Sequence, residues 1–394
     1  MMLATGFILI VLAVPATAFS LYLLSLTLLS RAEQAKTADS TRRLRFDLIV
    51  PAHNEAAAIE AVVANLLQLD WPDDGYRVMV VADNCSDTTA TLARAAGAEV
   101  LERHDTENRG KGYALEYAFQ ESQAKGWADA VFVVDADSEV SANMLEAFAT
   151  RIENGAQVIQ AHYSVLNPDD SWRTRLMAIA LAAFHQLRSR ARERLKLSCG
   201  IRGNGWCATH AVLREVPYSA YSLAEDIEFG IHLGLAKHRV HYADEVQVAG
   251  MMVSGEQASR SQRQRWEGGR WELLRQKLLP LLRASFRPGG TVCLDLALDL
   301  LVPPLSYVFI NIVIFILVAN IVALIEPTTK TWLWLGAFCG ISLVMYVLRG
   351  WQLSGVGLRG LVDLVRAPFF VLWKVLLMLR KRGPEWIRTE REQT

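Results

Sequence analysis

Two carboxylates separated by a single residue follow a short apolar run. Asp135 and Asp137 come directly after residues 130–134, which read as a buried strand. At the end of such a strand both carboxylates can approach one hard cation, and that cation can bridge to the oxygens of a diphosphate. A solvated acidic turn is the other interpretation, but carboxylates that end a central strand lie where open sheets bind ligands. The pattern therefore favours a Mg²⁺ or Mn²⁺ site.

Two polar clusters earlier in the chain end apolar runs in the same way. Asn54 and Glu55 follow the first run, and Asp83 follows the second. Such side chains can hold the base or the ribose of a nucleotide. The alternative is that they cap the helices that begin after them. In the second cluster, Asp87 is the better candidate for a cap.

The next segment combines two glycines with two basic residues and reads Asn108-Arg109-Gly110-Lys111-Gly112. Backbone N–H groups and cations in such a loop suit a diphosphate. Lys111 is therefore a candidate contact to a nucleotide, although loops of Gly and Lys are common and indicate little by themselves.

Two late motifs carry the remaining polar candidates. Asp226, in Ser222-Leu223-Ala224-Glu225-Asp226, opens a helix-like stretch and could deprotonate an acceptor hydroxyl as a general base. Arginines in the second motif could neutralise a leaving diphosphate, and a tryptophan face could stack on a sugar. Separately, each motif is more often ordinary surface chemistry. The candidates at the diphosphate and the acceptor are Glu225, Gln262, Arg263, Arg265 and Trp266.

The elements that must position these residues read as an α/β domain. Short β-rich runs at residues 46–50, 77–82 and 130–134 alternate with helical stretches at 56–69 and 88–96. Each run ends in polar residues. Strands that alternate with helices and carry ligands at their ends predict a doubly wound sheet.

Membrane segments flank this domain. Residues 3–29 are apolar and long enough to cross a hydrocarbon core of about 30 Å, and they lack the charged start and short apolar stretch of a signal peptide. The basic residues at 31–45 predict that this flank is cytoplasmic and that the N-terminus lies outside. Residues 303–325 and 331–348 read as two further spans, and residues 291–302 as an interfacial lead-in.

Two more segments combine apolar and charged character. Residues 172–197 end in a run of basic side chains, which indicates either a helix on the membrane surface or a charged helix packed on the domain. Residues 361–379 carry Asp363, Arg366 and Lys374 on nearly one face, and charges at mid-membrane are costly. We therefore expect an interfacial helix there.

Three crossings and four regions follow from this reading. The regions are an N-terminal transmembrane helix (1–30), a cytoplasmic α/β domain (31–290), two transmembrane helices (291–349), and an amphipathic helix with a cytoplasmic tail (350–394). The predicted location is the plasma membrane.

Composition excludes several classes of protein. The 394 residues carry 41 basic and 41 acidic side chains, so no global positive field favours nucleic acid. The five cysteines lie far apart without a CxxC spacing, which argues against a disulfide framework or a zinc site.

Taken in order, the motifs resemble those of the membrane-integrated family 2 glycosyltransferases of GT-A fold. That branch includes cellulose, chitin and hyaluronan synthases and bacterial exopolysaccharide glycosyltransferases. The resemblance covers about residues 46–282 and the flanking membrane helices. Its series D, DxD, ED and QxxRW is carried here by Asp83, Asp135-Ala136-Asp137, Glu225-Asp226 and Gln262-Arg263-Gln264-Arg265-Trp266.

The resemblance implies a role for each motif. Asp83 would contact the nucleotide, Asp135 and Asp137 would handle the metal and the diphosphate, and Asp226 would be the base of a single, inverting displacement. Gln262, Arg265 and Trp266 would lie at the donor diphosphate and the acceptor entrance, and Gly203-Asn204-Gly205-Trp206 looks like the acceptor-side loop. The sequence departs from the synthases at Ala224, where they usually carry Thr, which weakens any transfer of polymer specificity.

The expected activity is transfer of a sugar from a nucleotide-sugar, with UDP as the expected nucleotide, to a membrane-presented acceptor such as a polyprenyl-diphosphate-linked glycan. A glycolipid synthase with a ceramide-, diacylglycerol- or hopanoid-type acceptor and a processive polysaccharide synthase remain alternatives, because the motifs are shared. A binding protein without catalysis is disfavoured, because Asp135, Asp137, Asp226 and Arg265 are all retained.

Overall fold

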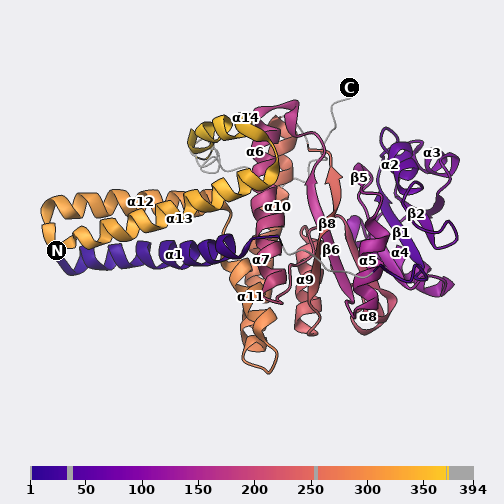
Figure 1. Cartoon of the computed structure of the whole chain (residues 1–394), viewed down its shortest axis with the longest axis horizontal. Coiled ribbons are helices and arrows are strands. Elements are labelled where there is room, and N and C mark those ends of the chain that lie inside the picture. Colours follow the sequence, from indigo (N-terminus) through magenta and orange to yellow (C-terminus); the bar gives the residue numbers. More distant parts are fainter. Residues whose placement is uncertain (1, 33–38, 253–255, 370, 372–394) are drawn as a thin grey trace.

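The computed structural model describes residues 2–32, 39–252, 256–369 and 371, with the backbone alone for residues 2–4 and 256–266. Its body is an α/β domain from which long helices project as a stalk (Figure 1). The predicted α/β domain between membrane helices is confirmed.

Eight strands form one mixed sheet in the order β3-β2-β1-β4-β7-β6-β8-β5. The first four strands in that order are parallel. Central strand β1 is buried on both faces, which explains its unbroken apolar run. The three strands predicted from apolar runs are all present, and the parallel strands are β1 (Phe46–Ala52), β2 (Tyr76–Asp83), β3 (Glu99–Arg103) and β4 (Ala130–Val133).

The other half of the sheet is mixed in direction. Strand β7 runs antiparallel to both β4 and β6, β6 pairs with β8 in parallel, and β5 closes the edge antiparallel to β8. The parallel arrangement typical of the predicted doubly wound sheet is therefore present in one half of the sheet and not in the other. The four strands of this half are β5 (Ser138–Val140), β6 (Val158–Val165), β7 (Trp206–Thr209) and β8 (Val240–Gly250).

Helices cover both faces of the sheet. Apolar side chains of α2 (Ile59–Leu66), α3 (Thr89–Ala95) and α5 (Met144–Glu153) pack in one core cluster. Those of α4 (Lys111–Lys125), α8 (His210–Glu215) and α9 (Glu225–Leu235) pack in a second. The sheet thus lies between two helical layers, as expected of a doubly wound fold.

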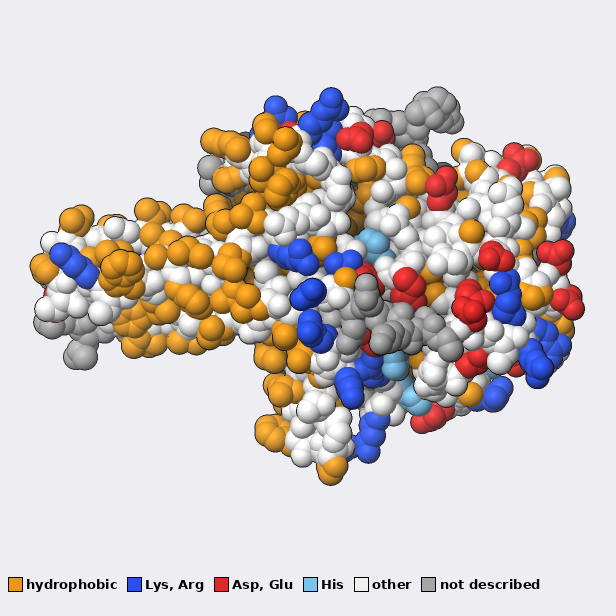
Figure 2. Space-filling model, in the orientation of Figure 1, with side chains coloured by type: hydrophobic (Ala, Val, Ile, Leu, Met, Phe, Trp, Pro, Cys, Tyr) orange, Lys and Arg blue, Asp and Glu red, His pale blue; other side chains and the backbone are white. Residues whose placement is uncertain are grey.

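The stalk consists of α1 (Met2–Leu29), α12 (Leu305–Ile325) and α13 (Thr331–Ser354), with the short η3 (Pro327–Lys330) between the last two. Among the described residues, three helices are long and apolar enough to cross a membrane, and they are these three. Their outer surface is apolar (Figure 2), and Leu324 and Trp334 are 85% and 79% exposed. Such exposure is expected of side chains that face lipid. The three predicted spans are thus present as helices.

A long helix joins the stalk to the body. It comprises α6 (Trp172–Leu181), a π-helical turn η2 (Ala182–Leu187) and α7 (Arg188–Arg194), and it packs against α13 and α1. Gly350 of α13 lies so close to this helix that an added Cβ would be 2.7 Å from the Cβ of Ala183. The close approach needs a residue without a side chain.

The basic half of this helix packs on the domain, which supports the second of its two interpretations. Arg188 donates to Asp299 at 2.9 Å, and Arg192 pairs with Asp295 at 2.9 Å and with Asp299 at 2.8 Å. Both carboxylates belong to α11 (Thr291–Leu301), and both arginines are buried. The membrane-surface interpretation is wrong for these two side chains, because carboxylates already neutralise them. We call Arg188, Arg192, Asp295 and Asp299 the arginine–aspartate joint.

The segment after the stalk returns to the body. It forms α14 (Gly357–Asp363) and η4 (Leu364–Arg366), next to α6. Asp363 is buried and accepts from Arg175 at 2.6 Å, so it does not lie on the water-facing side of an interfacial helix as predicted. Lys374 and most of the rest of the predicted helix lie outside the described residues.

Candidate active site

Three loops that carry predicted site residues leave the same edge of the sheet. Strands β1, β2 and β4 are neighbours and run parallel, so Asn54, Asp83 and Asp135 follow strand ends that lie side by side. The chain builds outward from β1 to β2 and β3 on one side, and β4 then adds on the other side of β1. Open α/β sheets bind ligands at such a switch point.

The nucleotide-side candidates tie the loops after β1 and β2 together. Asn54, with φ of 56°, accepts from the backbone N–H of Ser86 at 2.7 Å, and the N–H of Glu55 donates to the hydroxyl of Thr89 at 2.8 Å. Helix α2 begins only at Ile59, so Asn54 does not cap it. The capping alternative therefore fails for Asn54.

The other two acidic residues of this region have different partners. Asp87 accepts from the backbone N–H of Thr89, the first residue of α3, at 3.0 Å. Asp83 instead accepts from Arg103 at 2.7 Å. Arg103 ends β3 and was not a candidate in the sequence, because a single arginine in an edge strand carries no pattern.

Asp135 and Asp137 lie in the turn between β4 and β5, directly beyond the buried strand. Lys111, the first residue of α4, donates to a carboxylate oxygen of Asp135 and, at 2.6 Å, to the backbone carbonyl of Gly203. The backbone N–H of Asp135 donates to the side chain of Asn204 at 3.1 Å. The glycine-flexed segment thus brings its lysine to the paired aspartates.

Glu225 and Asp226 open helix α9 on the far side of the same loop. Gly203 has φ of 81°, and a Cβ added to it would lie 3.3 Å from a carboxylate oxygen of Asp226. Only a glycine allows the loop to pass so close in this conformation. The loop therefore connects Lys111 and Asp135 with the Glu225–Asp226 pair.

Charges within this group shift one another. Burial disfavours the charged form of Lys111, but Asp135, Glu225 and Asp226 outweigh it and raise the lysine pKa. Burial, then the neighbouring charge of Asp226, raises the pKa of Glu225 to about 7, and burial also raises the pKa of Asp226. An elevated carboxyl pKa suits a general base near neutral pH.

Tyr163, at the end of β6, is a site residue that the sequence did not reveal. Burial, followed by the charges of Asp135, Asp137 and Asp226, raises its pKa, so the phenol remains a protonated donor. Its ring stacks on His185 with centroids 5.1 Å apart. A lone tyrosine in a strand has no sequence signal, and only the sheet register brings it to the carboxylates.

The structure leaves the last motif untested. Gln262, Arg263, Arg265 and Trp266 belong to helix α10 (Glu256–Ser285), but their side chains lie outside the described residues. Their predicted place at the diphosphate and the acceptor stays a prediction.

Two carboxylates fit a metal that its substrate helps to hold. No group of three or more His, Cys, Asp or Glu side chains that could bind a metal occurs among the described residues. Magnesium is usually held by one or two carboxylates together with substrate phosphates and water. Asp135 and Asp137 are therefore suitable ligands for a divalent cation that arrives with a diphosphate.

The raised pKa of Glu225 predicts how stability depends on pH. Between its ordinary value of 4.5 and about 7, the folded protein holds a proton that the unfolded chain releases, so this residue lowers stability progressively as pH rises through that window. Glu225→Gln removes this effect. In the protein without metal or donor, we expect the Tm advantage of the variant to be small near pH 4.5 and full above pH 7.5, as measured by thermal unfolding. A constant difference across that range would contradict the assignment.

Comparisons with known proteins agree with this geometry. Residues 44–269 match the model of a family described as glycosyltransferase like family 2. A probable glycosyltransferase of Bacillus subtilis, YdaM, is 24% identical over 198 residues, which cover 48% of this chain and 46% of that protein. A beta-monoglucosyldiacylglycerol synthase of Synechocystis is 29% identical over 49% of this chain and 41% of its own length. The chain thus aligns with about half the length of these curated relatives.

One solved structure shares the fold over most of the chain. It is a mannosyltransferase from Pyrobaculum calidifontis in complex with GDP-Man and Mn²⁺. It superposes with a TM-score of 0.54 at 19% identity, over 86% of this chain and 99% of that one.

Proposed function

The chain belongs to the glycosyltransferase like family 2, and on that premise we propose that it transfers a sugar from a UDP-sugar to an acceptor presented at the membrane surface. A polyprenyl-diphosphate-linked glycan of cell-surface or exopolysaccharide biosynthesis is the acceptor we favour. The observation that carries the proposal is the single group of contacts in which Lys111 and Gly203 connect the strand-end Asp135 to Asp226.

Each side chain in this group has a distinct task in the proposed reaction. Asp226 takes the proton of the acceptor hydroxyl while the hydroxyl oxygen attacks the anomeric carbon of the donor sugar. The bond between that carbon and the nucleoside diphosphate breaks in the same displacement. The configuration at the anomeric carbon is therefore inverted. Lys111 offsets negative charge beside Asp135. A divalent cation held by Asp135 and Asp137 would neutralise the leaving diphosphate.

The test is incubation of the purified chain, in lipid nanodiscs, with radiolabelled UDP-sugars and a polyprenyl-diphosphate-linked acceptor. Label in the lipid-linked fraction supports the proposal. Label in diacylglycerol added in its place would favour a glycolipid synthase, the second candidate, to which the likeness to the Synechocystis synthase points.

We further propose that the stalk crosses the plasma membrane three times, with the catalytic domain and the C-terminus in the cytoplasm. The basic residues that follow α1 support this orientation, and in Figure 1 the N-terminus lies at the far tip of the stalk. Reporters fused at either end should place the N-terminus outside and the C-terminus inside. A C-terminus found outside would mean that a further segment spans.

Transfer of one or a few sugars is the outcome that we expect for each acceptor. Three helices can hardly enclose a polar path for a sugar chain without turning polar groups toward lipid, which is costly. The measurement is product length from the purified chain with donor in excess. A ladder of long polymer made by this chain alone would instead support a processive synthase.

A further inference from the structure

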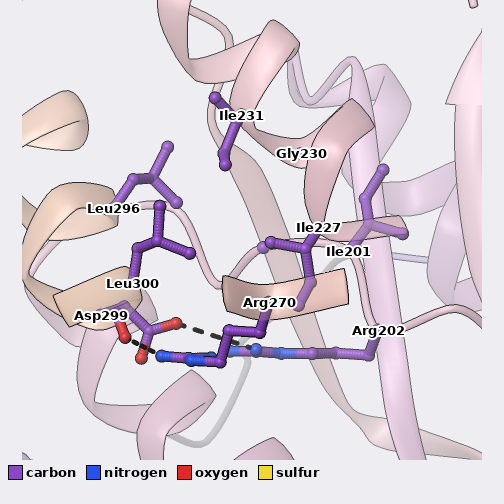
Figure 3. Close-up of a pocket in the computed structure, with 10 residues that line it drawn as sticks. Ile201, Arg202, Ile227, Gly230, Ile231, Arg270, Leu296, Asp299 and Leu300 are labelled. Carbon is purple, nitrogen blue, oxygen red and sulfur yellow. Dashed lines mark hydrogen bonds and ion pairs between the residues drawn. The ribbon is translucent and has the colours of Figure 1, made fainter. Parts of the chain in front are cut away.

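A small pocket lies beside the arginine–aspartate joint, between α9, α10, α11 and the loop before Gly203. Apolar side chains of these elements form its walls, and three charged residues, Arg202, Arg270 and Asp299, form its polar side (Figure 3). In Figure 3 both arginines extend toward Asp299. The apolar lining is Ile201, Ile227, Ile231, Leu296 and Leu300.

Positive charge exceeds negative charge around this pocket. Asp299 interacts electrostatically with four guanidinium groups, and the carboxylates of Asp295 and Asp226 also act on Arg202. The four guanidinium groups thus outnumber the three carboxylates in these interactions. Burial and the repulsion of the neighbouring arginines lower the pKa of Arg270 to about 10, because several positive charges lie close together. The four arginines are Arg188, Arg192, Arg202 and Arg270.

Arg202 is the arginine of this group whose guanidinium lacks hydrogen-bond partners and a close carboxylate. Its side chain is 4% exposed, and its nearest carboxylate oxygen, on Asp299, is 4.0 Å away. The Nε and Nη2 atoms are buried and have no hydrogen-bond partner among the described residues. The ring of Phe184 below the guanidinium, 4.6 Å away, compensates only part of the charge. A buried guanidinium with free N–H groups is costly unless an anion or water meets it.

The pocket lies next to the predicted membrane surface. Its wall residue Leu300 is five positions before Leu305, where the membrane helix α12 begins. The opposite face of α11 exposes Leu294, Leu298 and Leu301, which recur at helical spacing and are 36–44% exposed. A helix with one apolar face exposed beside a membrane span lies at the level of the lipid headgroups.

We propose that this pocket binds the phosphate group of a membrane lipid. The cavity, about 20 Å³, has room for about one water-sized group, which is the size of a single phosphate oxygen. That oxygen would accept from Nε and Nη2 of Arg202, the rest of the phosphate would lie at the mouth near Arg270, and the hydrocarbon would remain outside the cavity, because most of its apolar walls are themselves buried. Binding of a lipid here requires no sugar donor or acceptor, so its test does not depend on the proposed reaction.

The test is a binding titration of the purified full chain in neutral detergent, with no sugar donor or acceptor. Dioctanoyl phosphatidic acid should bind and raise Tm, and dioctanoylglycerol, which lacks the phosphate, should do neither. Inorganic phosphate should bind at least about tenfold more weakly than the lipid, because it lacks a hydrocarbon whose removal from water adds to the affinity. Equal affinity for lipid and inorganic phosphate would show a site for a free anion and overturn the lipid assignment.

Arg202→Gln is the decisive variant. We expect its affinity for phosphatidic acid to fall about tenfold or more, the range for hydrogen bonds to a charged group, while its ligand-free Tm stays equal or rises because an uncompensated charge is removed. Arg190→Gln is the matched control, because Arg190 pairs with Asp244 outside the pocket. It should lower Tm and leave the affinity unchanged.

Unchanged lipid affinity in Arg202→Gln would overturn the proposal. So would a failure of phosphatidic acid to bind the wild-type protein more tightly than dioctanoylglycerol, and that comparison remains decisive even if the variant does not fold.

Discussion

Asp226→Asn should bind the nucleotide-sugar donor nearly as well as the wild-type protein does, while turnover falls by about 10² or more, the range that general-base catalysis contributes. The substitution keeps the size of the side chain and its place beside Gly203, so the packing around it is retained. It removes the one group that we propose accepts the acceptor proton. Donor affinity from calorimetry and initial rates with saturating acceptor separate the two effects.

Glu228→Gln is the control for that variant. Glu228 lies half a turn further along α9, where it accepts from the backbone N–H of Ser222 and lies 3.6 Å from Lys277. Its loss should leave turnover close to that of the wild-type protein. If Asp226→Asn instead abolished donor binding, Asp226 would be a binding residue and another group would have to act as the base.

Removal of the divalent cation should have the second large effect. We expect activity to require Mg²⁺ or Mn²⁺, and Asp137→Asn nearly to abolish it at any concentration of either ion. With only two described carboxylates at the turn after β4, the loss of one leaves too few oxygen ligands for a hard cation. The measurements are turnover against metal concentration and donor affinity with and without metal.

A neighbouring carboxylate serves as control for Asp137. Glu139 lies two residues along in β5 and is exposed, so Glu139→Gln should keep full, metal-dependent activity. Full turnover of the wild-type protein in excess chelator would refute a metal at Asp135 and Asp137.

Sequence reasoning found the parts of the site that have local signals. Residues 130–134 are apolar because β4 is buried on both faces, and the polar residues that follow mark where that strand ends. Asp83 was likewise identified as a polar residue at the end of an apolar run. Because neighbouring parallel strands end at one edge, a pattern read along the chain became a prediction about proximity in space.

Where the partner is distant in the sequence, sequence reasoning could not decide between alternatives. The basic residues of the helix at 172–197 gave no hint that Asp295 and Asp299 neutralise them from more than a hundred positions away. Tyr163 reaches the carboxylates only through strand register, and β7 was too short to show periodicity. Helix lengths and strand ends are local properties, whereas charge compensation is a property of the folded whole.

The joint between stalk and body also fixes an order of events during synthesis. Tyr22 of α1 donates to Asp295 of α11 across 273 positions, and Arg192 of α7 donates to Tyr22. At translation rates of about 5–20 residues per second, α1 is therefore made roughly a quarter of a minute to a minute before its partner leaves the ribosome. During that interval only one of the three stalk helices has been made, so on the proposed topology a single helix holds the chain at the membrane. Arg188 and Arg192 lack their carboxylate partners until α11 arrives, so the docking of the stalk against the body is a late step in the maturation of the protein.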